Sequence, residues 1–87
     1  MFWHKNNKTL KDHPSIADRE RSFVCTMHGP FELFIENYGS LGDYDEEHIV
    51  LQAWKSTLII EGERLFIEYF TDIDMKVTGR IRRLQIQ

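Results

Sequence analysis

Apolar residues recur at every second position through the last third of the chain, and this pattern occurs twice. Its members are Leu58, Ile60, Gly62, Leu65, Ile67 and Tyr69, followed by Met75, Val77, Gly79, Ile81, Leu84 and Ile86. A period of two is typical of strands with one buried face, and glycine inside such a run indicates a tight turn. The pattern therefore predicts turns at 62–63 and 79–80, each with a strand on either side.

The same reading extends back to Phe23. Short strands are predicted over residues 24–28, 31–36, 41–44 and 48–54, with turns at 29–30, 37–39, 45–47 and 55–56. Connections of this length join antiparallel neighbours, because a parallel pair needs a crossover of a dozen or more residues. We therefore predict an all-β fold, a small antiparallel meander of about seven or eight short strands, arranged as a roll or as a sandwich.

The first 22 residues have a different character. They are polar and mixed in charge, and they carry no sustained apolar period. Residues 1–22 are therefore predicted to be a flexible N-terminal arm, followed by a β domain over residues 23–87. One helical turn is expected within the arm, starting at Pro14 and Ser15 and continuing to Glu20.

Size and composition limit the ways in which such a domain is stabilised. A chain of 87 residues forms one domain and buries roughly 60 to 65% of the surface that its unfolded form exposes. The single cysteine, Cys25, excludes an intramolecular disulfide, which fits a reducing compartment. Of the usual means of stabilising a small core, association with a partner is therefore favoured. The net charge of −3 argues against a general nucleic-acid binder, which needs an excess of Lys and Arg.

Targeting patterns are missing from the sequence. No apolar run reaches the length of a signal-peptide core or the roughly 20 residues that span a bilayer. The chain is therefore expected to stay inside the cell, with any membrane association being indirect.

Three groups of residues resemble sites of chemistry only in part. Cys25 and His28 have the C-x-x-H spacing of half a zinc site, but no second pair follows and strand positions three apart face opposite ways. His48 follows two glutamates without an identifiable nucleophile nearby, and the acidic run around Asp45 lacks the glycine and distal glutamate of a calcium loop. We predict no catalytic residue, no cofactor and no metal site.

Arginines and aromatic residues are the candidates for contact with other molecules. The strand ends carry Arg64, Arg80, Arg82 and Arg83, which form either a solvated edge that discourages strand pairing or a contact for an anionic partner. Phe2 and Trp3 lie outside the patterned domain, so they are candidates for a tether to a partner or a neighbouring subunit. Trp54 is expected in the core.

Several segments of residues 24–87 resemble the YabP/YqfC family of sporulation proteins. They are Thr26-Met27-His28-Gly29, Leu33-Phe34-Ile35-Glu36-Asn37-Tyr38-Gly39, Tyr44-Asp45 before Ile49-Val50-Leu51, Leu58-Ile59-Ile60-Glu61-Gly62-Glu63-Arg64-Leu65-Phe66-Ile67 and Val77-Thr78-Gly79-Arg80-Ile81. The Ile-Glu-Asn segment is similar to the YqfC side of the family. Members usually have glycine where this chain has Lys55 or Ser56, and a proline-containing lead-in where it has Arg21-Ser22-Phe23.

The resemblance implies a small cytoplasmic protein of the mother cell, acting with a membrane protein in spore envelope development and carrying no known catalytic residue. With the residue pattern, it leads to the hypothesis of a non-enzymatic interaction module that forms homo-oligomers, binds a membrane sporulation protein, or both. Residues 23–35 and 81–87 are the expected edge strands. Two alternatives are a small β-barrel that binds nucleic acid or another anionic ligand through aromatic residues, and a small hydrolase that uses His48.

Overall fold

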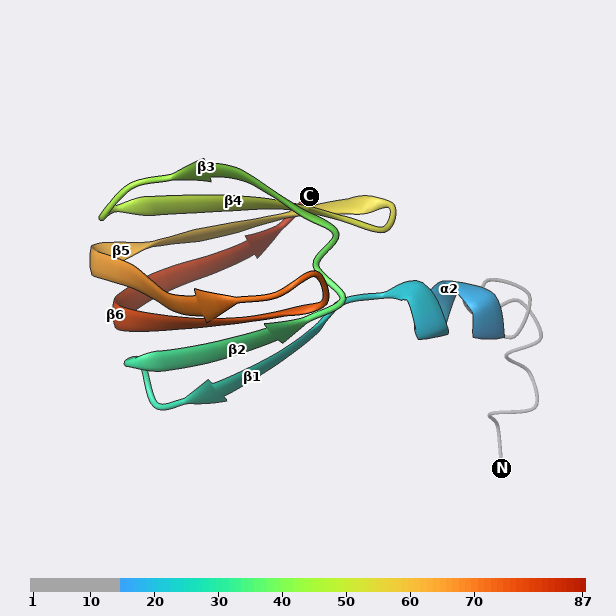
Figure 1. The fold of residues 1–87 in the computed structure, drawn as a ribbon, viewed down its shortest axis with the longest axis horizontal. Coiled ribbons are helices and arrows are strands. Elements are labelled where there is room, and N and C mark those ends of the chain that lie inside the picture. Colours follow the sequence, from blue (N-terminus) through green and yellow to red (C-terminus); the bar gives the residue numbers. More distant parts are fainter. Residues whose placement is uncertain (1–14) are drawn as a thin grey trace, which may run out of the picture.

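The computed structural model describes residues 15–87, which form one short helix and six strands (Figure 1). The helix α2 spans Ile16–Arg21, and the strands are β1 (Val24–His28), β2 (Glu32–Glu36), β3 (Ser40–Tyr44), β4 (His48–Ala53), β5 (Ser56–Phe70) and β6 (Asp74–Ile86). The all-β prediction is confirmed. The expected seven or eight strands are six, because β5 and β6 are each longer than predicted.

All six strands belong to one antiparallel sheet in the order β1-β2-β6-β5-β4-β3. The prediction that consecutive strands are neighbours is wrong for β2 and β3, since β2 pairs with β6 and β3 lies at the opposite edge. Residues 37–39 therefore connect strands in different parts of the sheet and do not close a hairpin, although Asn37 and Gly39 have positive φ angles of 60° and 90°. The Asn37 N–H donates instead to the Ile73 carbonyl.

Gly62 and Gly79 lie at bends inside β5 and β6, and the predicted turns at these glycines are wrong. Register shifts flank both positions in the pairing of β5 with β6. A Cβ atom on Gly62 would collide with the Arg80 carbonyl oxygen, and one on Gly79 would lie 2.6 Å from the Arg64 carbonyl oxygen. The two strands therefore cross too closely for any side chain at these positions, and the glycines let both strands bend and continue.

The bends fold the sheet into two layers. The first part of β5 pairs with β4 and with the last part of β6, whereas the first part of β6 pairs with β2 and with the last part of β5. One layer therefore contains β3, β4 and half of each long strand, and the other contains β1, β2 and the remaining halves. Figure 1 shows the two long strands running through both layers.

The tips of the two hairpins are attached to the two bends in the same way. The N–H groups of Gly62 and Leu65 donate to the carbonyls of Glu47 and Glu46 in the β3–β4 turn. Likewise, the N–H groups of Gly79 and Ile81 donate to the carbonyls of Phe31 and Pro30 in the β1–β2 turn. The unit β1-β2-β6 thus repeats the unit β3-β4-β5, and this repetition explains why the apolar pattern occurs twice in the sequence.

The core lies between the layers and consists of side chains from the alternating pattern. Its buried members are Leu33, Ile35, Tyr38, Ile49, Leu51, Leu58, Ile60, Leu65, Ile67, Met75, Val77 and Ile81. Tyr38, which was assigned to a turn, is buried between the strands and donates its hydroxyl hydrogen to the Thr71 carbonyl. No charged side chain is buried within residues 15–87.

Helix α2 begins where the sequence predicted a helical turn. Ser15 caps it by accepting a hydrogen bond from the Asp18 N–H at 3.0 Å. It contacts the β4–β5 turn through Lys55, which pairs with Asp18, and through Trp54, whose ring lies 4.6 Å from the Arg21 guanidinium and whose Nε1 donates to Asp18. Trp54 is 40% exposed in the β4–β5 turn, so the prediction that it belongs to the core is wrong.

The β4–β5 turn is formed by Trp54 and Lys55, one residue earlier than predicted, because Ala53 pairs with Ser56. Lys55 has a φ angle of 59°, which is in the left-handed region that glycine adopts without strain. This conformation gives a physical reason for glycine at this turn in the family that the sequence resembles.

Candidate interaction surfaces

A large depression lies over the two bends. We call it the bend surface; it has a volume of about 1130 Å³ and is lined by Phe31, Asp45, Glu46, Glu47, Glu63, Arg64, Gly79 and Arg80. The residues come from both hairpin turns and both long strands, because the hydrogen bonds at the bends bring these four segments together.

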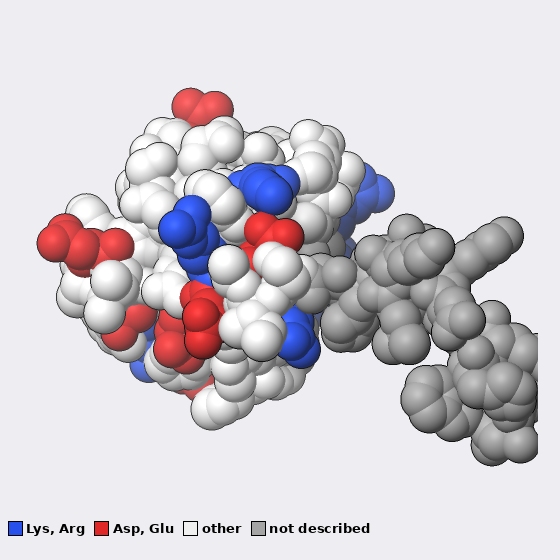
Figure 2. Space-filling model, turned by 90° about the vertical axis from the view of Figure 1, so that its right-hand side faces the viewer, with Lys and Arg blue, Asp and Glu red and all other residues white. Residues whose placement is uncertain are grey.

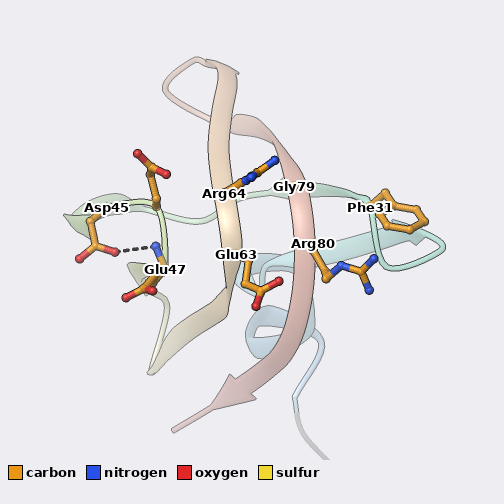
Figure 3. Close-up of a pocket in the computed structure, with 8 residues that line it drawn as sticks. Phe31, Asp45, Glu47, Glu63, Arg64, Gly79 and Arg80 are labelled. Carbon is orange, nitrogen blue, oxygen red and sulfur yellow. Dashed lines mark hydrogen bonds between the residues drawn. The ribbon is translucent and has the colours of Figure 1, made fainter.

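Charge on the bend surface is divided between its two sides, except that Glu63 lies between the two long strands near Arg80 (Figure 3). The β3–β4 turn contributes Asp45, Glu46 and Glu47, whereas the equivalent β1–β2 turn contributes the uncharged Gly29-Pro30-Phe31 segment. Arg64 and Arg80 extend toward the side of Phe31, and the labelled acidic side chains of the β3–β4 turn lie on the other side of β5 (Figure 3). The Arg80 guanidinium lies 5.7 Å from the centre of the Phe31 ring, which is 53% exposed.

The four candidate arginines do not form one basic strip. Arg82 is paired with Glu63 at 3.0 Å, and Arg83 with Glu61 at 3.4 Å. Among residues 15–87, no ion pair involves Arg64 or Arg80. On the face seen in Figure 2, basic and acidic side chains lie close together. The structure therefore brings Arg64 and Arg80 together at the bend surface and leaves Arg82 and Arg83 neutralised beside it.

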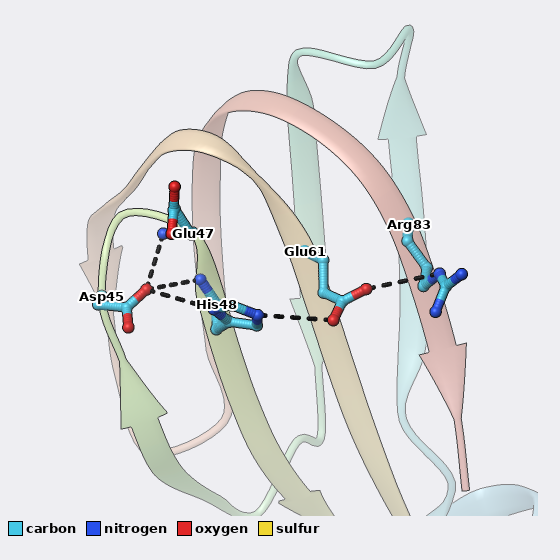
Figure 4. A network of polar contacts seen from close by, with 5 residues as sticks. All are labelled: Asp45, Glu47, His48, Glu61 and Arg83. Carbon is cyan, nitrogen blue, oxygen red and sulfur yellow. Dashed lines mark hydrogen bonds and ion pairs between the residues drawn. The ribbon is translucent and has the colours of Figure 1, made fainter.

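A second polar group crosses three neighbouring strands of one layer. We call it the polar row: Asp45, His48, Glu61 and Arg83 (Figure 4). His48 lies between two carboxylates, with Nδ1 3.7 Å from Asp45 and Nε2 3.6 Å from Glu61. The Asp45 carboxylate accepts hydrogen bonds from the N–H groups of Glu47 and His48, which hold its pKa below the ordinary value. All four side chains are at least about one third exposed, and the row links the β3–β4 turn to the neighbouring surface of β5 and β6.

The folded sheet has four edges, and three of them are obstructed. The last part of β5 is covered by the Tyr44 hydroxyl and the Glu46 carbonyl, which bind the N–H groups of Ile67 and Leu65. The edge strand β3 has an irregular register, and the last part of β6 is bulged and carries Arg82 and Arg83. The fourth edge, β1, pairs with β2 over five consecutive residues without a register shift.

The predicted edge strands are confirmed in part. Residues 81–86 lack a strand neighbour on the side away from β5, and β1 pairs only with β2 within the described chain. The segment 32–35 is not an edge, because β2 is held between β1 and β6. Edge status depends on which distant strands pair, and the local pattern does not carry this information.

The remaining candidates are the Cys25 and His28 pair, with the spacing of half a zinc site, and the aromatic residues Phe2 and Trp3. Cys25 packs partly against the core, where burial raises the pKa of its thiol to about 11. His28 lies on the opposite face of β1, 3.4 Å from Glu32. Residues 15–87 contain no group of three or more His, Cys, Asp or Glu side chains placed to hold a metal ion. Phe2 and Trp3 lie outside the described residues.

Two residues of these surfaces were missed by sequence reasoning. Phe31 begins the strand predicted over residues 31–36, yet it is exposed at the hairpin tip next to Arg80. Tyr44 was assigned to a connecting strand, yet its hydroxyl closes the β5 edge. The turn residues Gly29-Pro30 before Phe31 were the signal available, because a residue directly after a tight turn lies at the end of a hairpin.

Comparison with known proteins agrees with the resemblance seen in the sequence. The family model described as YabP family matches residues 19–87, which include every strand and the last part of α2. No curated protein and no solved structure matches the chain. No helix within residues 15–87 is long and apolar enough to cross a membrane. Because the match covers most of the chain, this protein belongs to the YabP family, a family of sporulation proteins.

Proposed function

We propose that this chain is a non-enzymatic interaction module of the mother-cell cytoplasm that acts in spore envelope development by binding a membrane protein at the bend surface. The Ile35-Glu36-Asn37 segment favours the YqfC side of the family. Membership in the YabP family supports the biological setting.

The proposal rests on Arg64 and Arg80, which have no ion-pair partner within the described chain and line the bend surface. This open depression also carries an exposed phenylalanine. Unpaired arginines next to an exposed aromatic ring are typical of contact surfaces, where Arg and aromatic residues contribute most of the binding energy.

The division of charge indicates the chemistry of the partner segment. An acidic stretch of the membrane protein would contact Arg64 and Arg80, and the carboxylates of the β3–β4 turn would repel it if it bound in the opposite direction. The carboxylates beside these arginines also disfavour nucleic acid, whose phosphates are negative along their whole length.

The test is made in the spore-forming host and compares two double variants, each of which removes two positive charges. R64A/R80A removes the unpaired arginines, and the matched control R82A/R83A removes the paired ones. We expect the R64A/R80A chain to be absent from the washed membrane fraction and its host to yield fewer heat-resistant spores. The R82A/R83A control should keep the membrane recovery and the spore yield of the unchanged chain. Equal recovery of the two variants would contradict the proposal. Salt-sensitive binding of the purified chain to single-stranded nucleic acid, lost in R64A/R80A, would support the alternative function instead.

A further inference from the structure

The edge strand β1 differs from the other three edges of the sheet in charge and in regularity. Its five residues, Val24-Cys25-Thr26-Met27-His28, include no Asp, Glu, Lys or Arg, and their register with β2 is unbroken. Natural sheets protect their edges with charges, bulges or covering groups, because a regular open edge is a template for another strand. The other three edges each carry at least one of these protections, and β1 carries none among the described residues.

The core is also open at β1. Met27 pairs with Leu33 and therefore points to the core side of the sheet, yet it is 42% exposed. Cys25, on the same face, is only partly buried. A strand added beside β1 would cover these two apolar side chains and would extend the core past its present boundary.

We propose that β1 is the site at which a second copy of this chain pairs, antiparallel to the first, to form a two-fold symmetric dimer with one layer continuous across both copies. The inference deepens the proposed function, because it gives the interaction module a defined oligomeric state on a surface separate from the bend surface.

Self-complementarity favours a second copy over another occupant. Antiparallel pairing centred on Thr26 places Val24 against His28 of the partner subunit and Cys25 against the partner's Met27, so no like charges meet. At β6, antiparallel pairing centred between Arg82 and Arg83 would place each arginine opposite the other arginine of the copy. At β3, the irregular register with β4 leaves no regular edge for a second strand. An isologous pairing uses the edge of both copies and therefore closes at two.

The mass of the purified full chain by light scattering, over a dilution series that spans the micromolar range, tests the inference. Thr26→Lys places a positive charge opposite itself at the proposed dimer axis, on a side chain that is exposed in the single copy. The matched control, Ser40→Lys, adds the same charge to the exposed first residue of the β3 edge. Far-UV circular dichroism verifies that both variants keep their strands.

We expect the unchanged chain and S40K to be dimers that dissociate on dilution. T26K should already dissociate at a protein concentration about tenfold higher, or be monomeric throughout the series, because like charges placed face to face weaken association by at least this factor. A monomer at every concentration overturns the inference, as does a dimer that T26K leaves unchanged. Hydrogen exchange at the β1 amides then shows whether residues 1–14 cover the edge instead.

The two proposals fail separately. The mass measurement uses purified protein without a membrane, whereas the membrane-recovery assay uses variants of Arg64 and Arg80, which are not part of β1. A monomeric chain that still binds membranes would overturn the dimer alone.

Discussion

The Asp45 side chain holds the β3–β4 turn together. Its carboxylate accepts two backbone hydrogen bonds at 2.7 Å each and lies in the polar row beside His48. The same turn supplies the Glu46 and Glu47 carbonyls that bind the β5 bend. A change at Asp45 is therefore expected to reach the bend surface through the backbone.

We predict that Asp45→Ala lowers the free energy of unfolding at pH 7. The variant's free energy of unfolding should also fall less than that of the unchanged chain as the pH is lowered. The pKa of Asp45 is lower in the folded chain than in the unfolded one, so its stabilising contribution is present above the unfolded pKa and is lost as the pH falls through the folded pKa. Urea titrations at pH 7 and pH 3 measure this. The stability gap between the two proteins should narrow at pH 3, and a constant gap would contradict the assignment.

Lys55 offers a second test at the residue scale. Its left-handed φ angle of 59° strains any residue with a Cβ atom, by roughly 1–2 kcal/mol. Lys55 also forms an exposed ion pair with Asp18 at 3.2 Å, which is worth at most about 1 kcal/mol. Lys55→Gly and Lys55→Ala both remove this pair, but only glycine relieves the strain.

We therefore expect Lys55→Gly to be more stable than Lys55→Ala by about 1 kcal/mol in thermal or urea unfolding. Comparing the two variants cancels the loss of the ion pair. If alanine proved as stable as glycine, the turn would not hold Lys55 in the left-handed conformation.

At the scale of elements, the alternating pattern predicted which residues face the core. Leu58, Ile60, Leu65, Ile67 and Met75 are all buried, as a period of two requires. The pattern did not separate a turn from a bend, because Gly62 and Gly79 interrupt the alternation in either case. The pattern also did not show that β2 pairs with β6, because the local alternation of side chains does not indicate which strand about 40 residues away is the partner.

The bends give a prediction at this scale. Gly62→Ala should lower the free energy of unfolding by at least about 2 kcal/mol, because the added Cβ collides with the backbone of the neighbouring strand. Gly29→Ala is the matched control: its φ angle is 58°, but the nearest atom to an added Cβ is a Phe31 ring carbon at 4.0 Å. The control should cost only about 1 kcal/mol of conformational strain. Equal losses would show that β5 and β6 do not approach closely at the bend.

The candidate sites were harder to predict than the elements. The sequence identified Arg64, Arg80, Arg82 and Arg83 as a group, but it did not show that Glu61 and Glu63 neutralise two of them. That division follows from the register of β5 against β6 and from the bulge at Arg82, which shifts the pairing by one residue. Trp54 was misplaced for a related reason, because a turn that starts one residue earlier moves its ring from the sheet to the hairpin end.

For the molecule as a whole, the two long strands make the layers depend on each other. Leu33 lies in the layer of β1 and β2, and Leu51 lies in the layer of β3 and β4, yet both are fully buried in the same core. Because β5 and β6 contribute to both layers, we expect that neither layer retains its strand pairing when the other unfolds.

We expect Leu33→Ala and Leu51→Ala each to lower the free energy of unfolding by roughly 2–5 kcal/mol, in one cooperative transition. Far-UV circular dichroism and tryptophan fluorescence, followed through the same urea titration, should give coincident curves for both variants. Separate transitions for the two probes in either variant would mean that the layers fold independently.

The pairing of β2 with β6 has a consequence during synthesis of the chain. Because β3, β4 and β5 follow one another without interruption, their hairpins can form as the polypeptide leaves the ribosome. The hairpin β1-β2 emerges first but has no neighbour until residues 74–78 follow, so Leu33 and Ile35 stay uncovered through most of translation. The earliest part of the domain to be made is thus the last to be completed, and during this interval chaperones have access to its apolar face.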